Sequence, residues 1–147
     1  MKAVPDSLSN NATFLLNRAA KLVLEAHENA LLPLKLTPRD FNMLALLAGD
    51  GPVSQHVLAS RYKVDRTTMA QLVDGLADRD LLARMENEHD RRSNLLYITV
   101  KGKKVLAQAK RLSDREQKRF LSPLSESEWA QIRMQLTNLI EFHMSED

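Results

Sequence analysis

Two short amphipathic helices predicted between residues 54 and 81 constrain the fold more than any other feature of the chain, because only Lys63 and Val64 separate them. Ser54 and Asp65 stand where each helix begins, and both residue types cap helix N-termini. The second helix has one apolar face at i, i+3, i+4 and i+7 spacing, formed by Met69, Leu72, Val73 and Leu76. Two helices joined by so short a turn, after a preceding capped helix, predict a helix-turn-helix.

A β-hairpin is predicted directly after this unit. The apolar segments LLARM and LLYIT flank a charged loop, so residues 82–99 form two strands and a connecting tip. A helix-turn-helix followed by a hairpin is a winged helix. The sequence therefore predicts a winged helix-turn-helix with a two- to three-stranded wing.

Further helices are predicted on both sides of this unit. A stripe of apolar residues marks a helix over 8–31, which Pro33 ends. Thr37 and Pro38 give the next helix a strong start signal. Thr99 caps a helix through about Phe120, and Ser125 and Glu128 form a capping box at the start of a last helix, so the fold class is mainly α.

Composition bounds the protein class. A chain of 147 residues with 44% hydrophobic and 27% charged residues predicts one globular domain over 1–147. The absence of cysteine excludes disulfides and thiol chemistry. No apolar run approaches the length of a membrane span and no signal peptide is evident, so we expect a cytoplasmic protein. No catalytic or nucleotide-binding motif is present, and the sequence predicts neither an enzyme nor a cofactor.

The helix that begins after Asp65 presents polar side chains opposite its apolar face. The residues predicted to read base edges in the major groove are Arg66, Thr67, Thr68 and Gln71. Asp74 would be repelled by phosphates, so we expect it to pair with a cation such as an arginine of the wing. A merely solvated helix face is the alternative interpretation.

The hairpin tip is the second candidate DNA contact. Arg91 and Arg92 are predicted to enter the minor groove, with Asp90 orienting one of them through a charge-assisted hydrogen bond. A solvated turn is one alternative. A metal site is the other, built from Glu86, Glu88, His89 and Asp90, but neighbouring strand residues point to opposite faces and converge poorly. No metal is therefore predicted.

Net charge alone says little about partners, since it is only +2. The segment 99–120 is strongly basic, which also fits a solvated helix face. The segment 37–98 is close to neutral. This near-neutral charge keeps open the alternative of a winged-helix protein-interaction module that does not bind DNA.

The wing resembles that of the multiple antibiotic resistance regulator (MarR) family of bacterial transcription factors. The family pattern is D-x-R, five residues, L-T, two residues, G, which stands here as Asp90, Arg92, Ile98-Thr99 and Gly102. Ile98 in place of Leu keeps the apolar strand position. The segment VDRTTMAQLVDGLADRDLL is also similar to the family's recognition helix, although Asp80 stands where Gly is frequent.

The resemblance implies a homodimer on a pseudo-palindromic DNA site. Residues 37–99 would form the DNA-binding part, and 8–31 and 100–144 would form dimerisation helices, whose apolar stripes need a partner to bury them. Two recognition helices would then enter successive major grooves about 34 Å apart. Ser54 and Gln55, at a helix N-terminus, would contact phosphate.

By the same resemblance, the protein would be a repressor that a small, often aromatic or phenolic, ligand releases from DNA. The candidate pocket residues are Arg18, Lys21, His27, Arg39 and Phe41. Each of these is equally well explained as a surface or packing residue. DNA-bound protein would be associated with the bacterial nucleoid.

Overall fold

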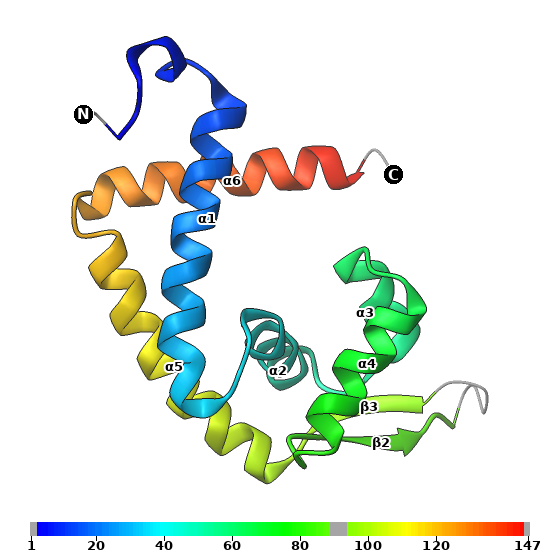
Figure 1. The fold of residues 1–147 in the computed structure, drawn as a ribbon. Coiled ribbons are helices and arrows are strands. Elements are labelled where there is room, and N and C mark those ends of the chain that lie inside the picture. Colours follow the sequence, from blue (N-terminus) through cyan, green and yellow to red (C-terminus); the bar gives the residue numbers. More distant parts are fainter. Residues whose placement is uncertain (1–2, 89–93, 146–147) are drawn as a thin grey trace.

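The computed structural model describes residues 3–88 and 94–145. In it a compact winged helix-turn-helix is joined to long helices that extend away from it (Figure 1). The elements are η1 (Asp6–Leu8), α1 (Ala12–Leu31), η2 (Leu32–Leu34), α2 (Pro38–Asp50), β1 (Val53–Ser54), α3 (Gln55–Tyr62), α4 (Arg66–Ala77), β2 (Leu82–Glu86), β3 (Asn94–Ile98), α5 (Val100–Phe120) and α6 (Glu126–Ser145). The predicted fold class is confirmed.

Helix starts follow the predicted capping residues. Thr37 and Asp40 form a reciprocal capping box at the start of α2, with Pro38 in the first turn. Ser125 and Glu128 exchange the equivalent bonds at α6. The first helix differs from the prediction, because α1 begins at Ala12 and not near Leu8. Asn11 caps it by accepting a bond from the Phe14 amide, and a separate 3₁₀ turn precedes it.

Within the described residues the strands form one antiparallel sheet of order β1–β3–β2. β2 pairs with β3 from Leu82 opposite Ile98 to Glu86 opposite Asn94. The two-residue strand β1 pairs with β3 through Val53 and Leu96. The sheet therefore joins the wing to the start of α3, and the predicted hairpin is extended by a third strand.

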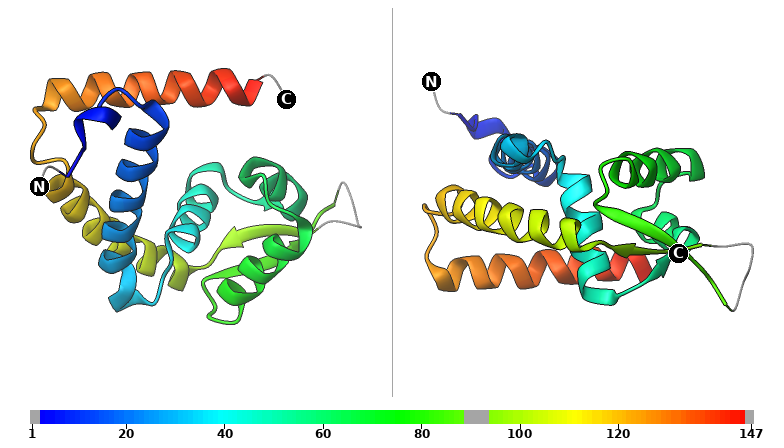
Figure 2. Two further views of the ribbon diagram at one scale, coloured as in Figure 1. Left: turned by 45° about the horizontal axis from the view of Figure 1, so that its top comes forward. Right: turned by 90° about the horizontal axis from the view of Figure 1, so that it is seen from below.

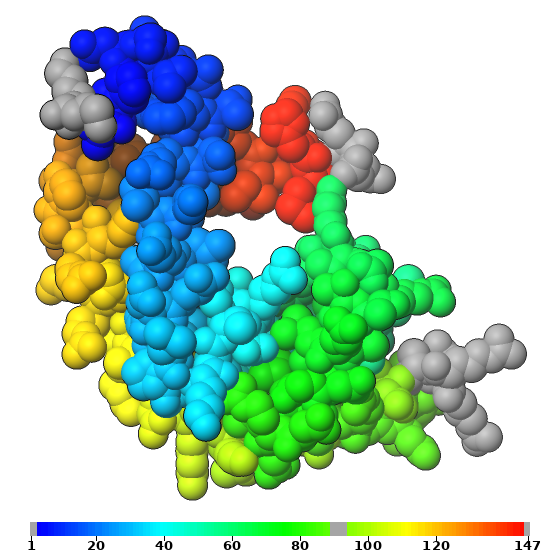
Figure 3. Space-filling model, viewed as in Figure 1, coloured from blue at the N-terminus to red at the C-terminus, as the bar shows by residue number. Residues whose placement is uncertain are grey.

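The core lies inside the winged helix-turn-helix. Its buried side chains come from α2, α3, α4, the sheet and the connections at Leu36 and Leu81, with Leu31, Leu106 and Ala109 added from α1 and α5. α1 and α5 pack side by side (Figures 1 and 2). In the described part of the chain α6 buries no residue, and a gap separates it from α2 in the space-filling view (Figure 3). No helix in the described ranges is apolar and long enough to span a bilayer.

Candidate nucleic-acid interface

Helix α4 is fixed by its cap and by its buried face. The Asp65 carboxylate accepts bonds from the Thr68 amide (2.9 Å) and the Thr68 hydroxyl (2.7 Å). These bonds with Thr68 lower the pKa of Asp65 below its usual range, so the cap is ionised at neutral pH. Met69, Val73 and Leu76 are buried against the core. The rest of the helix surface is thereby held in a defined orientation.

Of the predicted base-reading residues, Thr67 and Gln71 lie on the outer side of α4, and Arg66 and Thr68 lie in its first turn. Arg66, Thr67 and Gln71 are exposed. Thr68 is half-buried and its hydroxyl donates a hydrogen bond to Asp65, so this side chain is part of the helix cap. The N-terminal half of α4 thus presents exposed side chains that can pair with the edges of purine bases, while the apolar face of the helix is buried.

The start of α3 places the two predicted phosphate contacts. The Ser54 hydroxyl accepts a bond from the Val57 amide (3.3 Å) and caps the helix, and Gln55 is its first residue. Both side chains are half-buried. Since α3 packs on α4, this helix start and the outer side of α4 belong to one rigid unit.

The wing is tied to α4 at its base. Asp74 of α4 forms an ion pair with Arg84 of β2. Arg84 is therefore the cation that accompanies Asp74, and it lies in a strand and not at the tip. The expected pairing of Asp74 with an arginine of the wing is thus confirmed, although which arginine it is depends on how the hairpin folds back on the helix. The predicted tip residues Asp90, Arg91 and Arg92 lie outside the described residues.

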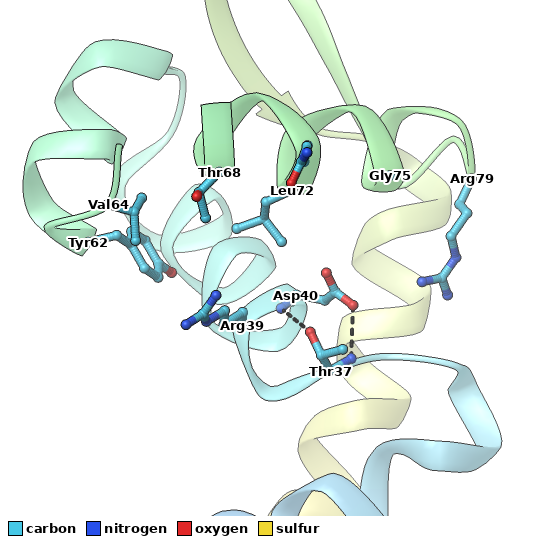
Figure 4. A pocket seen from close by; sticks show the side chains of 10 residues that line it. Thr37, Arg39, Asp40, Tyr62, Val64, Thr68, Leu72, Gly75 and Arg79 are labelled. Carbon is cyan, nitrogen blue, oxygen red and sulfur yellow. Dashed lines mark hydrogen bonds between the residues drawn. The ribbon is translucent and has the colours of Figure 1, made fainter. Parts of the chain in front are cut away.

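The residues predicted to bind a ligand do not converge on one cavity. His27 and Phe41 line a cavity of about 260 Å³ between α1, α2 and α5, together with Val23, Ala26, Asn42, Ser113, Glu116, Gln117 and Phe120. Arg39 lines a separate cavity of about 450 Å³ between the start of α2 and α4 (Figure 4). Arg18 and Lys21 are exposed on α1 and line neither cavity.

Among the polar residues that line the smaller cavity, His27 has a buried ring nitrogen and an aromatic neighbour. Its ring contacts the Phe41 ring edge-on, with 5.1 Å between centroids. Burial lowers the pKa of His27, so the imidazole is neutral at pH 7. Its Nε2 atom is buried, and within the described part of the chain it has no hydrogen-bond partner. A buried polar atom without a partner is costly, and a bound molecule could supply that partner.

Among residues 3–88 and 94–145, no three His, Asp or Glu side chains gather as metal ligands would. Two members of the metal alternative, His89 and Asp90, fall outside those ranges. Glu86 ends β2 opposite Asn94, which is an ordinary strand position.

Comparison with family models matches residues 34–93 to the model described as MarR family. This match covers α2, the helix-turn-helix and the first part of the wing. A protein named "Putative transcriptional regulatory protein for hcr operon", from Thauera aromatica, is 31% identical over 93 residues, or 63% of this chain. The chain spans 56% of the length of that curated relative.

Solved structures extend the similarity to nearly the whole chain. The repressor CouR bound to a 23-mer DNA duplex is 28% identical with a TM-score of 0.88, over 95% of this chain and 99% of that one. CouR from Rhodococcus jostii RHA1 bound to p-coumaroyl-CoA is also 28% identical, with a TM-score of 0.80 over 92% and 95% of the two chains. The shared architecture therefore includes the long helices as well as the winged helix-turn-helix.

Proposed function

Because this chain belongs to the MarR family of transcriptional regulators, we propose that it is a homodimeric repressor that binds pseudo-palindromic duplex DNA. The observation that carries the proposal is the outer side of α4. Thr67 and Gln71 are exposed there and Arg66 is exposed at the first turn of the helix, while Met69 and Val73 hold the opposite face in the core. The proposal is one of binding and not of catalysis, and it places the protein on the bacterial nucleoid when bound to its operator.

Base readout is assigned to the N-terminal half of α4. Arg66 is suited to the O6 and N7 atoms of guanine, Gln71 to adenine, and Thr67 to a phosphate or a thymine methyl group. The Ser54 and Gln55 amides at the start of α3 are suited to phosphate, because a helix N-terminus carries a partial positive charge. These phosphate contacts would set the register in which α4 lies along the groove.

Minor-groove contact is assigned to Arg91 and Arg92, with Asp90 orienting one of them. The support is indirect and comes from the base of the wing. The Asp74–Arg84 pair joins β2 to α4, so the wing and the recognition helix approach DNA as one body. A narrow minor groove next to the occupied major groove concentrates negative potential for such arginines.

Dimerisation is assigned to the long helices. In the single chain, large apolar side chains stay exposed on α1 (Leu16 52%, Leu24 49%) and on α6 (Ile140 57%, Phe142 60%). A helix of 20 residues with no buried side chain, as α6 is here, needs a partner to hide its apolar surface from water. Sedimentation velocity at several concentrations tests whether the chain is a dimer.

Release from DNA is assigned to a small aromatic or phenolic ligand in the cavity at His27 and Phe41. Its volume of about 260 Å³ suits one substituted ring, and the free Nε2 of the neutral imidazole suits a hydroxyl group. CouR, which binds p-coumaroyl-CoA, is a similar chain of the same architecture. Arg39, Arg18 and Lys21 stay predictions for this pocket, since the single chain does not place them in it.

Selection of bound sequences from random duplex DNA tests the function. The selected site is then titrated with wild-type protein and with Arg66→Ala, Gln71→Ala and Arg92→Ala variants at several salt concentrations. We expect Arg66→Ala to lose about 1–3 kcal/mol of discrimination at one base position. Arg92→Ala should weaken binding while the dimer stays folded. Loss of a phosphate contact should lower the salt slope by about one unit.

A matched control is Arg61→Ala, which removes an arginine of the same DNA-binding part whose guanidinium pairs with Asp50. We expect it to keep the selected site and its base preferences. No selected sequence, together with salt-insensitive behaviour toward duplex DNA, would reject the proposal in favour of a protein-interaction module. Unchanged affinity of Arg92→Ala would remove only the wing tip from the mechanism.

A further inference from the structure

Arg79 occupies an unusual position just beyond the C-terminal end of α4. Its Nη1 atom donates to the Lys35 carbonyl (2.7 Å) and its Nη2 atom to the Leu34 carbonyl (2.9 Å). The side chain extends from the end of α4 toward the connection between α1 and α2 (Figure 4). Lys35 has a φ of 53°, a left-handed conformation that ends η2 and turns these carbonyls out of any helix. The planar guanidinium thus binds two successive carbonyls across 44 and 45 positions of sequence.

The segment that follows α4 is also held from its other side. We call Arg79, Asp80 and Leu81 the α4–β2 corner. The Arg79 carbonyl accepts a bond from the Lys101 Nζ (2.8 Å) and the Asp80 carbonyl from the Thr99 hydroxyl (2.7 Å). The Leu81 carbonyl accepts a bond from the Thr99 amide (3.1 Å). All three carbonyls of the corner are therefore bound to the first turn of α5 or its cap.

The corner thus connects the recognition helix to the two helices that pack against each other outside the DNA-binding part. The α1–α2 connection holds it through Arg79, and the start of α5 holds it through Thr99 and Lys101. The apolar core contacts between α2 and α5 resist separation but have no strong direction. A guanidinium with two fixed acceptors does have direction, because its donors lie in one plane at set angles. Turning α4 relative to α1 would break both bonds.

We propose that Arg79 is the positioning residue that sets the angle between the recognition helix and the dimerisation helices, and thereby the operator half-site spacing that the dimer accepts. This inference rests on the proposed function, in which two copies of α4 enter successive grooves. One added base pair moves a half-site by about 3.4 Å and turns it by about 35° around the DNA axis. A dimer with a fixed angle between its helices tolerates such a shift poorly, whereas one without the Arg79 bonds adapts to it.

The test compares duplexes that contain the two selected half-sites with the natural separation and with one or two base pairs added or removed. Wild type, Arg79→Met and Arg79→Lys are titrated against this series and against a single half-site. Arg79→Met keeps the apolar stem and removes both bonds, while Arg79→Lys keeps the charge and can reach one carbonyl. Arg61→Met is the matched control, because it removes a guanidinium that pairs with Asp50 of α2 and not, among the described residues, with the α4–β2 corner.

We expect wild type and Arg61→Met to prefer one separation strongly. Arg79→Met should lose roughly tenfold of this preference, with Arg79→Lys intermediate, while affinity for the single half-site stays within about twofold. Melting curves of the same samples report folding, which a spacing profile does not. An Arg79→Met protein that binds every duplex more weakly but keeps the wild-type profile overturns the inference. A wild-type protein with no preferred DNA at all rejects the proposed function itself.

Discussion

Gly102→Ala tests the packing between α5 and the α4–β2 corner most directly. Gly102 is buried in the first turn of α5. A Cβ added there would lie 2.0 Å from the Leu81 carbonyl oxygen and 2.8 Å from Ile98 Cγ1. The oxygen belongs to backbone that also accepts the Thr99 amide, so it cannot move aside alone. The start of α5 must instead shift by roughly an ångström away from the corner to restore ordinary contact distances.

The size of the effect follows from three contributions. Overpacking of a core position costs about 1–3 kcal/mol. The shift also weakens the two Thr99 bonds to the corner, each contributing about 0.5–1.5 kcal/mol. The better helix propensity of alanine returns about 1 kcal/mol. We therefore expect a net loss of about 2–3 kcal/mol in the free energy of unfolding, which lowers the melting temperature by roughly 5–10 °C in a chain of this size.

Thermal and urea unfolding followed by circular dichroism measure this loss, at one protein concentration because dimer stability depends on it. Gly75→Ala is the matched control. Gly75 lies within α4, and an added Cβ there meets nothing within 4 Å. That substitution should raise stability by up to about 1 kcal/mol. A Gly102→Ala protein that melts at or above the wild-type temperature would refute the close-approach argument.

Three further predictions address other parts of the molecule. Burial lowers the pKa of His27 below 6.5, so at mildly acidic pH the unfolded chain binds a proton at this residue more readily than the folded chain does. The free energy of unfolding should therefore fall as pH drops below about 6.5. Melting curves of His27→Gln should show a shallower fall over the same pH range. Arg84→Met removes the ion pair with Asp74, in which the arginine and aspartate side chains are 37% and 60% exposed. The free energy of unfolding measured in urea should therefore change by less than about 1 kcal/mol. Gel shifts should nevertheless show weaker operator binding, because the wing is no longer joined to α4 by this pair. Ile140→Glu places a charge on the exposed apolar side of α6 and should yield monomers in sedimentation velocity; an intact dimer would place the interface elsewhere.

The parts of the fold that could be predicted from the sequence are those decided within a few residues. Thr37, Asp65 and Ser125 cap the helices they were expected to cap, because a capping side chain binds an amide three positions away. The apolar stripe of α4 also predicts its buried face correctly, since helical spacing is a local property. An apolar stripe does not by itself predict where a helix begins. Leu8 fits the spacing of the α1 stripe, but the helix begins after Asn11, which caps it.

Contacts between distant segments had no such local signal, apart from the expectation that Asp74 pairs with some arginine of the wing. Arg79 reaches carbonyls 44 and 45 positions earlier, and Asp74 meets Arg84 only because the hairpin folds back on α4. The short strand β1 depends on its pairing with β3 and has no pattern of its own at two residues. The candidate site divides in the same way. Residues of a single helix, such as Arg66 and Gln71, could be grouped from the sequence, whereas a pocket that draws on three helices could not.

The wing signature combines two physical roles, of which the structure describes the one at Thr99 and Gly102. Thr99 and Gly102 belong to the attachment of α5, since the threonine binds the corner and the glycine permits its close approach to Leu81. Asp90 and Arg92, before β3, carry the proposed DNA contact. Substitutions at the two ends of the motif should therefore weaken DNA binding for different reasons. Substitutions at Thr99 or Gly102 act through stability and the orientation of α4, and a substitution at Arg92 acts on the contact itself, so only the first kind should move the melting temperature.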